Sequence, residues 1–255
     1  MSNQINSHLS GNTVLPGDNV SEILKAYRDD ENKPVIVGPG LKRLNKQLIN
    51  SYKAGQLLHR PVNLFWINSH QRYYIPCERD TVVGVVISKT STFCRVDIGA
   101  SESATLSLMA FPNATKRNKA IVEIGDVLFA CVLSASKDVE TELVCMDKDG
   151  KKDGFGVLPR GGYMIKVPLN ICRRLLASDS KISRNLGRKY RFEKTVGLNG
   201  RIWIRSKSIQ TTILISNFIK QLEYVSDDQQ DHVLNLLEQK MNNNKNNKHK
   251  HSRKL

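Results

Sequence analysis

The chain has few cysteines and no long hydrophobic run, and both absences exclude classes of protein. Its five cysteines are odd in number, widely spaced and without a C-x-x-C pair, so neither a disulfide framework nor a zinc site is expected. The longest aliphatic stretch, VVGVVI, is far too short to span a bilayer. The N-terminus MSNQINSHLSGN is polar and shows no secretory signal. We therefore expect a soluble intracellular protein with no membrane partner.

The sequence patterns of common enzymes are also missing. There is no phosphate-binding P-loop, no H-E-x-x-H and no nucleophile elbow. Asp147 and Asp149 resemble the spacing of a metal loop, but Lys148, Lys151 and Lys152 oppose cation binding there. We expect no catalytic activity, no metal ion and no cofactor.

Positive charge is in clear excess. Lys and Arg outnumber Asp and Glu by 39 to 24, which gives a formal net charge of +15. Such an excess favours a polyanionic partner, with nucleic acid as the first candidate. The simpler explanation is a solvated basic surface that helps solubility.

Changes in composition divide the chain into five parts. Residues 1–12 are expected to be disordered, and 13–76 read as a small β domain with short strands and many Pro/Gly turns. Residues 77–150 form a second β unit, and 151–241 mix strands and helices and end in an extra helix. Residues 242–255 are a disordered, basic, low-complexity tail. Within the first domain, EILKAYR is either a loop or one helical turn.

The second unit has the pattern of a small barrel. Five apolar or alternating segments follow one another: DTVVGVVISKT, TFCRVDIGA, ATLSLMAF, IVEIGDVLFACVLSA and ETELVCM. A basic insertion precedes the fourth, and Gly125-Asp126 makes a turn at its start. This arrangement is typical of an OB fold, and its rhythm is that of S1 domains.

The third unit reads strand, helix, helix, strand, strand, helix, which is the order of a type I KH domain. KH domains grip RNA with a G-x-x-G loop between the two adjacent helices. Here that junction, LLASDSKIS, contains no glycine, while GLNG lies between the second and third strands. We predict a structural turn at Gly197, Asn199 and Gly200, with a two-residue type I′ hairpin. Gly197 would allow close approach of a neighbouring domain.

The fold class is therefore multidomain, mainly β and then α+β: an N-terminal β domain, an S1 (OB-fold) barrel, and a type I KH domain without a G-x-x-G helix–helix loop. This order, together with MAFPNATKRN, GFGVL and VGLNGRIWI, resembles the cap subunits of the eukaryotic RNA exosome, and within them the exosome component 3 type. The resemblance covers roughly residues 14–239.

The resemblance implies a non-catalytic subunit that sits on a ring of RNase PH-type proteins and stabilises it. It implies as partners those ring subunits, the other S1-containing cap proteins, exosome nucleases and nuclear cofactors. It also implies that single-stranded RNA passes the cap to a separate nuclease, with rRNA precursors, small nuclear and nucleolar RNAs and mRNA as substrates. The expected location is the nucleus and nucleolus, and also the cytoplasm.

Candidate RNA contacts are basic, because the aromatic positions of many S1 domains are occupied here by Thr92 and Arg95. Phe93 is expected to face the opposite side of the strand and to join the core. Without base stacking, RNA contact should be weak, charge-driven and sensitive to salt. The candidate residues are Lys89, Arg95, Lys116, Arg117 and Lys119; a merely solvated loop is the alternative for the last three.

Four apolar residues are candidates for a subunit interface: Met109, Phe111, Pro112 and Trp203. Each is equally compatible with a place in the core. Two other functions stay open, a free-standing S1/KH RNA-binding protein of ribosome assembly or translation, and a nuclease that uses these modules as appendages. The second of these lacks a catalytic domain within the chain.

Overall fold

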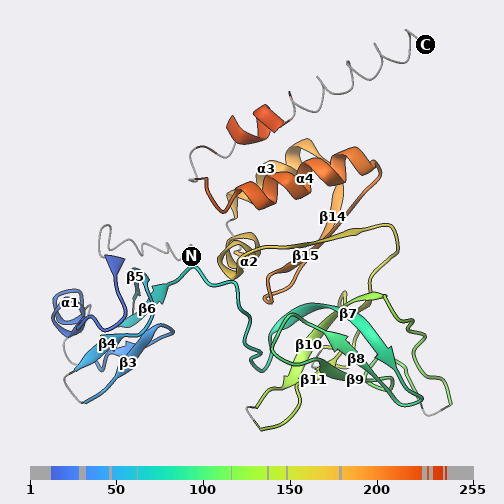
Figure 1. The fold of residues 1–255 in the computed structure, drawn as a ribbon, viewed down its shortest axis with the longest axis horizontal. Coiled ribbons are helices and arrows are strands. Elements are labelled where there is room, and N and C mark those ends of the chain that lie inside the picture. Colours follow the sequence, from blue (N-terminus) through green and yellow to red (C-terminus); the bar gives the residue numbers. More distant parts are fainter. Residues whose placement is uncertain are drawn as a thin grey trace. The chain divides into compact units, whose positions relative to one another are not determined.

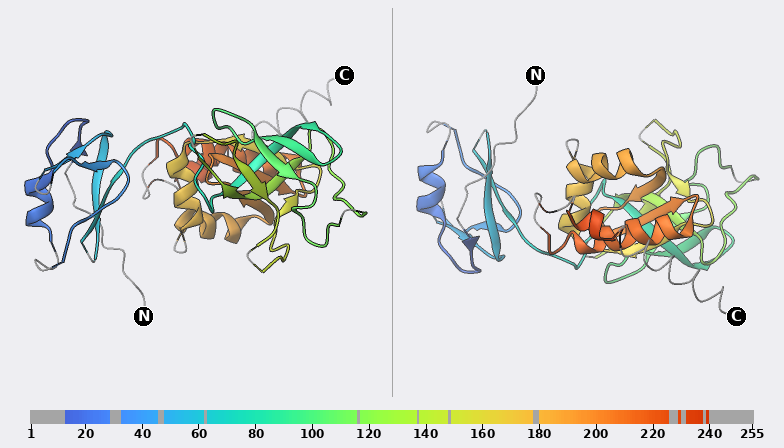
Figure 2. Two further views of the ribbon diagram at one scale, coloured as in Figure 1. Left: turned by 90° about the horizontal axis from the view of Figure 1, so that it is seen from below. Right: turned by 90° about the horizontal axis from the view of Figure 1, so that it is seen from above.

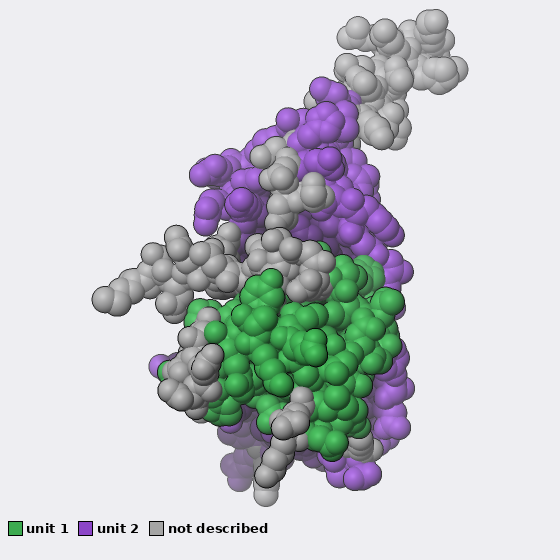
Figure 3. All heavy atoms as spheres, turned by 90° about the vertical axis from the view of Figure 1, so that its left-hand side faces the viewer, with its two compact units in different colours: residues 1–71 green, residues 72–255 purple. Residues whose placement is uncertain are grey.

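A computed structural model of the 255-residue chain divides it into two compact units, residues 1–71 and 72–255 (Figure 3). Each unit is described by itself. The structure describes residues 13–28, 33–45, 48–61, 63–115, 117–136, 138–147, 149–177, 180–225, 229, 232–237 and 239. The expected disorder of residues 1–12 and 242–255, and the candidate Lys116, lie outside these ranges.

Unit 1 is a small β domain with one helix. Its strands are arranged in the order β1-β5-β6-β2, and β3 and β4 form a separate hairpin. Its core consists of apolar side chains such as Leu24, Leu57 and Phe65, which are fully buried. The segment EILKAYR, which the sequence left open, is mostly helical. The elements are β1 (Thr13–Val14), α1 (Ser21–Ala26), β2 (Ile36–Val37), β3 (Leu41–Arg43), β4 (Ile49–Ser51), β5 (Gly55–Arg60) and β6 (Leu64–Asn68).

Unit 2 begins with a closed five-stranded barrel, as predicted for the S1 domain (Figure 1). Its strands are β7 (Thr81–Lys89), β8 (Phe93–Asp97), β9 (Ala104–Ser107), β10 (Val127–Ser134) and β11 (Glu142–Val144). Antiparallel pairs link β7 to β8 and β10, β8 to β9, and β10 to β11; a parallel pair of β9 with β11 closes the ring. The short β12 (Gly156–Val157) adds to the edge of β10.

Alternation explains why these segments form a barrel. Along β10, Leu128, Ala130 and Val132 are buried in the barrel interior while the residues between them are partly or fully exposed. Small side chains of one strand fit against large ones of another in such a narrow interior. The turn at Gly125 (φ 90°) allows the chain to enter β10, in agreement with the sequence.

The second half of unit 2 has the predicted β-α-α-β-β-α order of a type I KH domain. The elements are β13 (Tyr163–Lys166), α2 (Leu169–Leu176), α3 (Lys181–Lys189), β14 (Phe192–Val196), β15 (Arg201–Ser206) and α4 (Ile209–Gln221). The sheet order is β13-β15-β14, and Figure 2 shows the three helices grouped beside it. Residues 232–237 are helical, and Leu234 is buried in the same core.

The junction between α2 and α3 is a capped helix start. The Ser180 hydroxyl accepts a hydrogen bond from the Ser183 N–H (3.3 Å), which satisfies one of the N–H groups that a helix leaves open at its start. Helix α3 therefore begins with a side-chain cap, and residues 177–180 contain no glycine, as the sequence shows. A G-x-x-G clamp does not exist at this position.

Candidate nucleic-acid interface

The segment GLNG forms the loop of a β-hairpin between β14 and β15. Val196 pairs with Ile202, and the Gly197 N–H donates to the Arg201 carbonyl (2.9 Å), so Leu198–Gly200 make a three-residue loop. Only Gly200 of the four residues has a positive φ (75°). The hairpin prediction is confirmed, but the two-residue type I′ turn is wrong, since that turn needs positive φ at both central residues.

The hairpin completes an unpaired edge of the barrel. β8 pairs with β7 only from Val85 onward. On the side of β7 that faces β8, the backbone before Val85 is therefore not paired with a strand. The Leu198 N–H donates to the Thr81 carbonyl (2.8 Å), next to the contacts of Asn199. The KH loop thus takes the place of a neighbouring strand, which protects backbone groups that would otherwise be unsatisfied.

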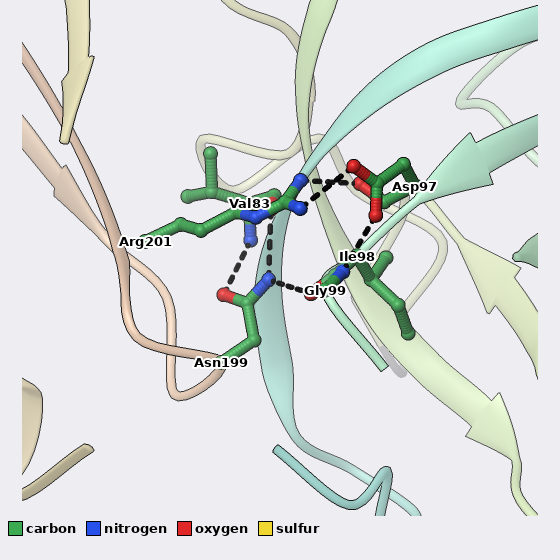
Figure 4. Close-up of polar contacts among 6 residues, drawn as sticks. All are labelled: Val83, Asp97, Ile98, Gly99, Asn199 and Arg201. Carbon is green, nitrogen blue, oxygen red and sulfur yellow. Dashed lines mark hydrogen bonds and ion pairs between the residues drawn. The ribbon is translucent and has the colours of Figure 1, made fainter. Parts of the chain in front are cut away.

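Asn199 provides most of this contact through its side chain (Figure 4). Its Oδ1 accepts from the Val83 N–H (3.2 Å), and its Nδ2 donates to the carbonyls of Val83 (2.8 Å) and Ile98 (2.7 Å). Asn199 is 5% exposed. A buried amide with three partners in one geometry fixes orientation as well as distance.

Gly197 permits the close approach that the sequence suggested. A Cβ at Gly197 would lie 2.7 Å from the Val83 nitrogen and 2.3 Å from Asn199 Oδ1, so no larger residue fits without displacing the loop. Of the three predicted turn residues, Gly197 and Asn199 meet the barrel, whereas Gly200 lies against Val167 and Leu169 of the KH half.

Arg201 adds an ion pair beside the hairpin. Its guanidinium donates to the Asp97 carbonyl (2.5 Å) and to Asp97 Oδ2 (2.8 Å), and its side chain is 3% exposed. Partial burial alone would raise the pKa of Asp97, but hydrogen bonds from Arg201 and from the Gly99 N–H outweigh it and hold the pKa below its ordinary value. The KH domain and the barrel are thereby fastened by both neutral and charged contacts.

A groove of about 480 Å³ lies on the outside of the barrel, over β8, β9 and β11. This is the face that OB folds use for oligonucleotides, between the loops that follow strands 1 and 4. The lining residues are Thr92, Phe93, Arg95, Thr105, Ser107, Ala110, Leu133, Glu140, Glu142 and Leu143.

Phe93 lies in this groove, and the expectation that it belongs to the core is wrong. Its side chain is 38% exposed, while Cys94 and Val96 of the same strand point into the barrel and are fully buried. Phe93 therefore shares the outer face with Arg95. The expectation failed because β8 begins at Phe93, so Thr92 belongs to the preceding turn and does not set the alternation.

The described basic candidates lie at separate positions on the barrel. Arg95 lies in the groove, where it contacts Glu140 (3.3 Å), and Lys119 donates to the Ser91 carbonyl (2.5 Å) in the turn just before β8. Lys89 is exposed at the end of β7, and Arg117 is exposed in the long loop. Sequence analysis did not assign the two carboxylates of the groove, Glu140 and Glu142, because no motif marks them and the strand pairing that brings them beside Arg95 is not local in the chain.

The candidates for a subunit interface separate into surface and interior residues. Met109 is 46% exposed and Pro112 is half-buried, so both can meet a partner. Phe111 is packed in the barrel core, and Trp203 is 3% exposed, with its indole so close to Gly162 that a Cβ there would lie at 2.2 Å. Phe111 and Trp203 are therefore covered within the chain itself, which favours their core interpretation.

Within the described ranges, no group of three or more His, Cys, Asp or Glu side chains is arranged to hold a metal ion. The same part of the chain has no helix of the length and apolarity needed to cross a bilayer. The arrangement offers binding surfaces, namely an outer barrel groove and a buried joint between two modules.

Comparison with known proteins gives matches along most of the chain. Three family models match: "Mammalian exosome complex component RRP40, N-terminal" over residues 10–70, "Exosome complex component RRP40, S1 domain" over 74–156, and "KH domain" over 162–210. Exosome complex component RRP40 of Homo sapiens is 34% identical over 252 residues, covering 89% of this chain and 90% of the human protein. The RRP40 protein of Drosophila melanogaster is 40% identical over 210 residues, covering 82% and 88%.

A solved structure shares the fold. The crystal structure of a protein described as an exosome complex RNA-binding protein superposes with a TM-score of 0.55 at 20% sequence identity, covering 66% of this chain and 96% of that one. At this identity the likeness concerns the fold alone.

Proposed function

Because the chain belongs to the family of exosome complex component RRP40, we propose that it is a non-catalytic cap subunit of the RNA exosome. In this role it stabilises a ring of RNase PH-type proteins, together with the other S1-containing cap subunits. It helps guide single-stranded RNA into the central channel for 3′–5′ processing and degradation, with rRNA, small nuclear and nucleolar RNA and mRNA as substrates. Its place is the nucleus and nucleolus, and also the cytoplasm.

The buried hairpin is the observation that carries the scaffolding part of this proposal. The glycine-containing loop of the KH domain faces the barrel, where Asn199 bonds to Val83 and Ile98. A loop used in this way is not available to hold a sugar–phosphate backbone. This loop therefore acts through packing, and exosome nucleases supply the chemistry.

Affinity purification from cells tests the assembly. A tagged chain should return RNase PH-type proteins and the other S1-containing cap proteins in equal amounts with itself, with nucleases and nuclear cofactors in smaller amounts. Recovery of ribosomal or translation factors instead would refute the proposal. The purified chain alone should not degrade a labelled RNA, and its fluorescent fusion should concentrate in nucleus and nucleolus.

A free-standing RNA-binding protein is the second candidate, and Phe93 is the observation that favours it. An exposed aromatic ring beside Arg95, on the nucleic-acid face of an OB fold, is the arrangement that stacks on a base. Each stacked base contributes about 1–3 kcal/mol. Tight RNA binding by the isolated chain that resists added salt would support this candidate, whereas weak and salt-sensitive binding supports the cap subunit.

A further inference from the structure

A second concavity, of about 490 Å³, lies where the KH domain meets the barrel. It shares no lining residue with the outer groove on β8, β9 and β11. Its walls come from separated parts of unit 2: Arg72 precedes the barrel, Lys166 ends β13, Lys220 is in the last turn of α4, and Glu223 and Tyr224 follow that helix. We call this feature the junction cavity. Its volume is in the range of sites for small ligands.

The described residues that line the junction cavity carry more positive than negative charge, with Arg72, Lys166, Arg201 and Lys220 against Glu223. Lys166 and Lys220 are exposed, and neither has a hydrogen bond or an ion pair to any residue that the structure describes. Among the described residues of the wall, Glu223 carries the only carboxylate, and it is bound by Arg72. Two ammonium groups from different elements thus line one hollow without a direct ion pair to a described residue, although the Asp97 carboxylate, which is paired with Arg201, also attracts Lys166.

Two further features of the wall suit a nucleotide. Tyr224 is 81% exposed, and its side chain interacts with Arg72, so an accessible aromatic ring lies beside the two lysines. Pro168 caps the start of α2, whose first turn contains no acidic residue and whose cap makes no side-chain hydrogen bond. The positive end of that helix therefore adds to the attraction of a phosphate group.

We propose that the junction cavity binds one nucleotide unit of single-stranded RNA, with the phosphate held by Lys166 and Lys220 and the base stacked on Tyr224. Basic side chains beside an aromatic ring are the combination that proteins use for single strands without sequence preference. The proposal rests on the proposed function, because RNA must reach this subunit. It gives the KH half a phosphate contact at the joint with the barrel, at a position other than the helix–helix loop that KH domains use.

The test measures binding of a short, fluorescein-labelled, mixed-sequence RNA strand to the full chain by anisotropy at several salt concentrations. Loss of one charge-assisted phosphate contact in K166Q/K220Q should weaken binding about tenfold. The slope of log affinity against log salt should fall by about 0.7, the value for one phosphate of a single strand. Y224A should weaken binding by about tenfold through lost stacking, while Y224F should bind as the wild type does.

Matched variants distinguish RNA binding at the junction cavity from general electrostatic attraction of RNA and from binding at the outer groove. K181Q/R188Q removes the same charge from exposed positions of α3, and it should change the affinity by less than about twofold. F93A tests the groove on its own. An equal loss in K181Q/R188Q and K166Q/K220Q would overturn the proposal, because net charge alone would then explain the binding.

The remaining outcomes are also decisive. If F93A weakens binding and K166Q/K220Q does not, the junction cavity is not an RNA site while the proposed function stands. If the wild-type chain binds no RNA, alone or within the purified complex, both fail. If a fluorescent polyglutamate peptide binds through Lys166 and Lys220 and RNA does not, the hollow receives an acidic protein segment and the proposal is refuted.

Discussion

Replacing Asn199 with alanine should open the joint between the KH hairpin and the barrel. The change removes three hydrogen bonds and leaves the Val83 N–H, the Val83 carbonyl and the Ile98 carbonyl without their partner. A buried polar group that loses its partner costs about 1–3 kcal/mol. At the low end of this range for each group, the joint loses roughly 3 kcal/mol, which corresponds to more than a hundredfold easier opening.

Amide hydrogen exchange measures this effect where it occurs. Global unfolding is less suitable, because a chain of several domains need not unfold in one step. The Val83 amide, which donates to Asn199 Oδ1, reports directly on local opening. We expect it to exchange about a hundredfold faster in N199A than in the wild type, while amides in the middle of β10 keep their rates.

N118A is the matched control, because Asn118 is exposed in the long barrel loop. Such a surface substitution should change stability by less than about 0.5 kcal/mol. If the Val83 amide in N199A exchanges within about threefold of its wild-type rate, the hydrogen bonds of Asn199 do not hold the joint. The reasoning from buried polar groups would then be refuted for this site.

Three further predictions concern stability and thiol chemistry. G162A should lower the free energy of unfolding, measured by thermal unfolding, by about 1–3 kcal/mol, because its Cβ would lie 2.2 Å from the indole of Trp203. G187A, which has open space around it in α3, should raise this free energy by up to about 1 kcal/mol. The opposite order would refute the packing argument. The pKa of Asp97 is lowered in the folded state, so the stability that its carboxylate contributes is present above pH 3.8 and is lost as pH falls through the folded pKa. Below that range, the urea midpoint of D97N should change less with pH than the midpoint of the wild type. A variant with the same pH profile as the wild type would contradict this. A thiol reagent should modify the exposed Cys77 in the folded protein, and early modification of the buried thiols would contradict their placement. The buried thiols are Cys94, Cys145 and Cys172, and burial raises the pKa of the last two to about 12.

The order and type of the elements in unit 2 could be predicted because local patterns and tertiary packing agree there. The alternation along β10 places Leu128 and Ala130 inward, and this alternation is visible in the sequence. The helix start at Ser180 is likewise a local feature, because the capping side chain belongs to the residue directly before the helix. Where a structural feature depends only on residues close together in the chain, the sequence is sufficient to predict it.

The face of Phe93 could not be predicted, because alternation gives relative positions and needs a fixed starting residue. The positions assigned to Thr92 and Arg95 by the resemblance to S1 domains suggested a register for the strand, but the strand begins at Phe93. A shift of one residue exchanges the inner and outer faces of a strand. The groove therefore contains an aromatic ring that the sequence placed in the core.

The role of Asn199 shows a different limit. Asn-Gly predicts a tight turn because asparagine tolerates a positive φ, yet Asn199 does not adopt one. Its side chain instead bonds to Val83 and Ile98, more than 100 residues earlier in the chain. The junction cavity is hidden from the sequence for the same reason, since Arg72, Lys166 and Lys220 come together only through the packing of the two modules.

The joint also determines how the two features proposed to contact RNA, the outer groove and the junction cavity, relate to each other. Asp97 lies at the end of β8, the strand that presents Phe93 and Arg95 to the groove, and Arg201 pairs with Lys166 across the KH sheet. The ion pair of Asp97 and Arg201 therefore connects the strand of the groove to the strand of the junction cavity. A rigid connection keeps a fixed spacing between the stacking surface at Phe93 and the phosphate site of the junction cavity. An RNA strand that binds at one of them is therefore already aligned with the other. Such alignment lowers the entropy cost of the second contact, which makes the buried hairpin important for RNA guidance.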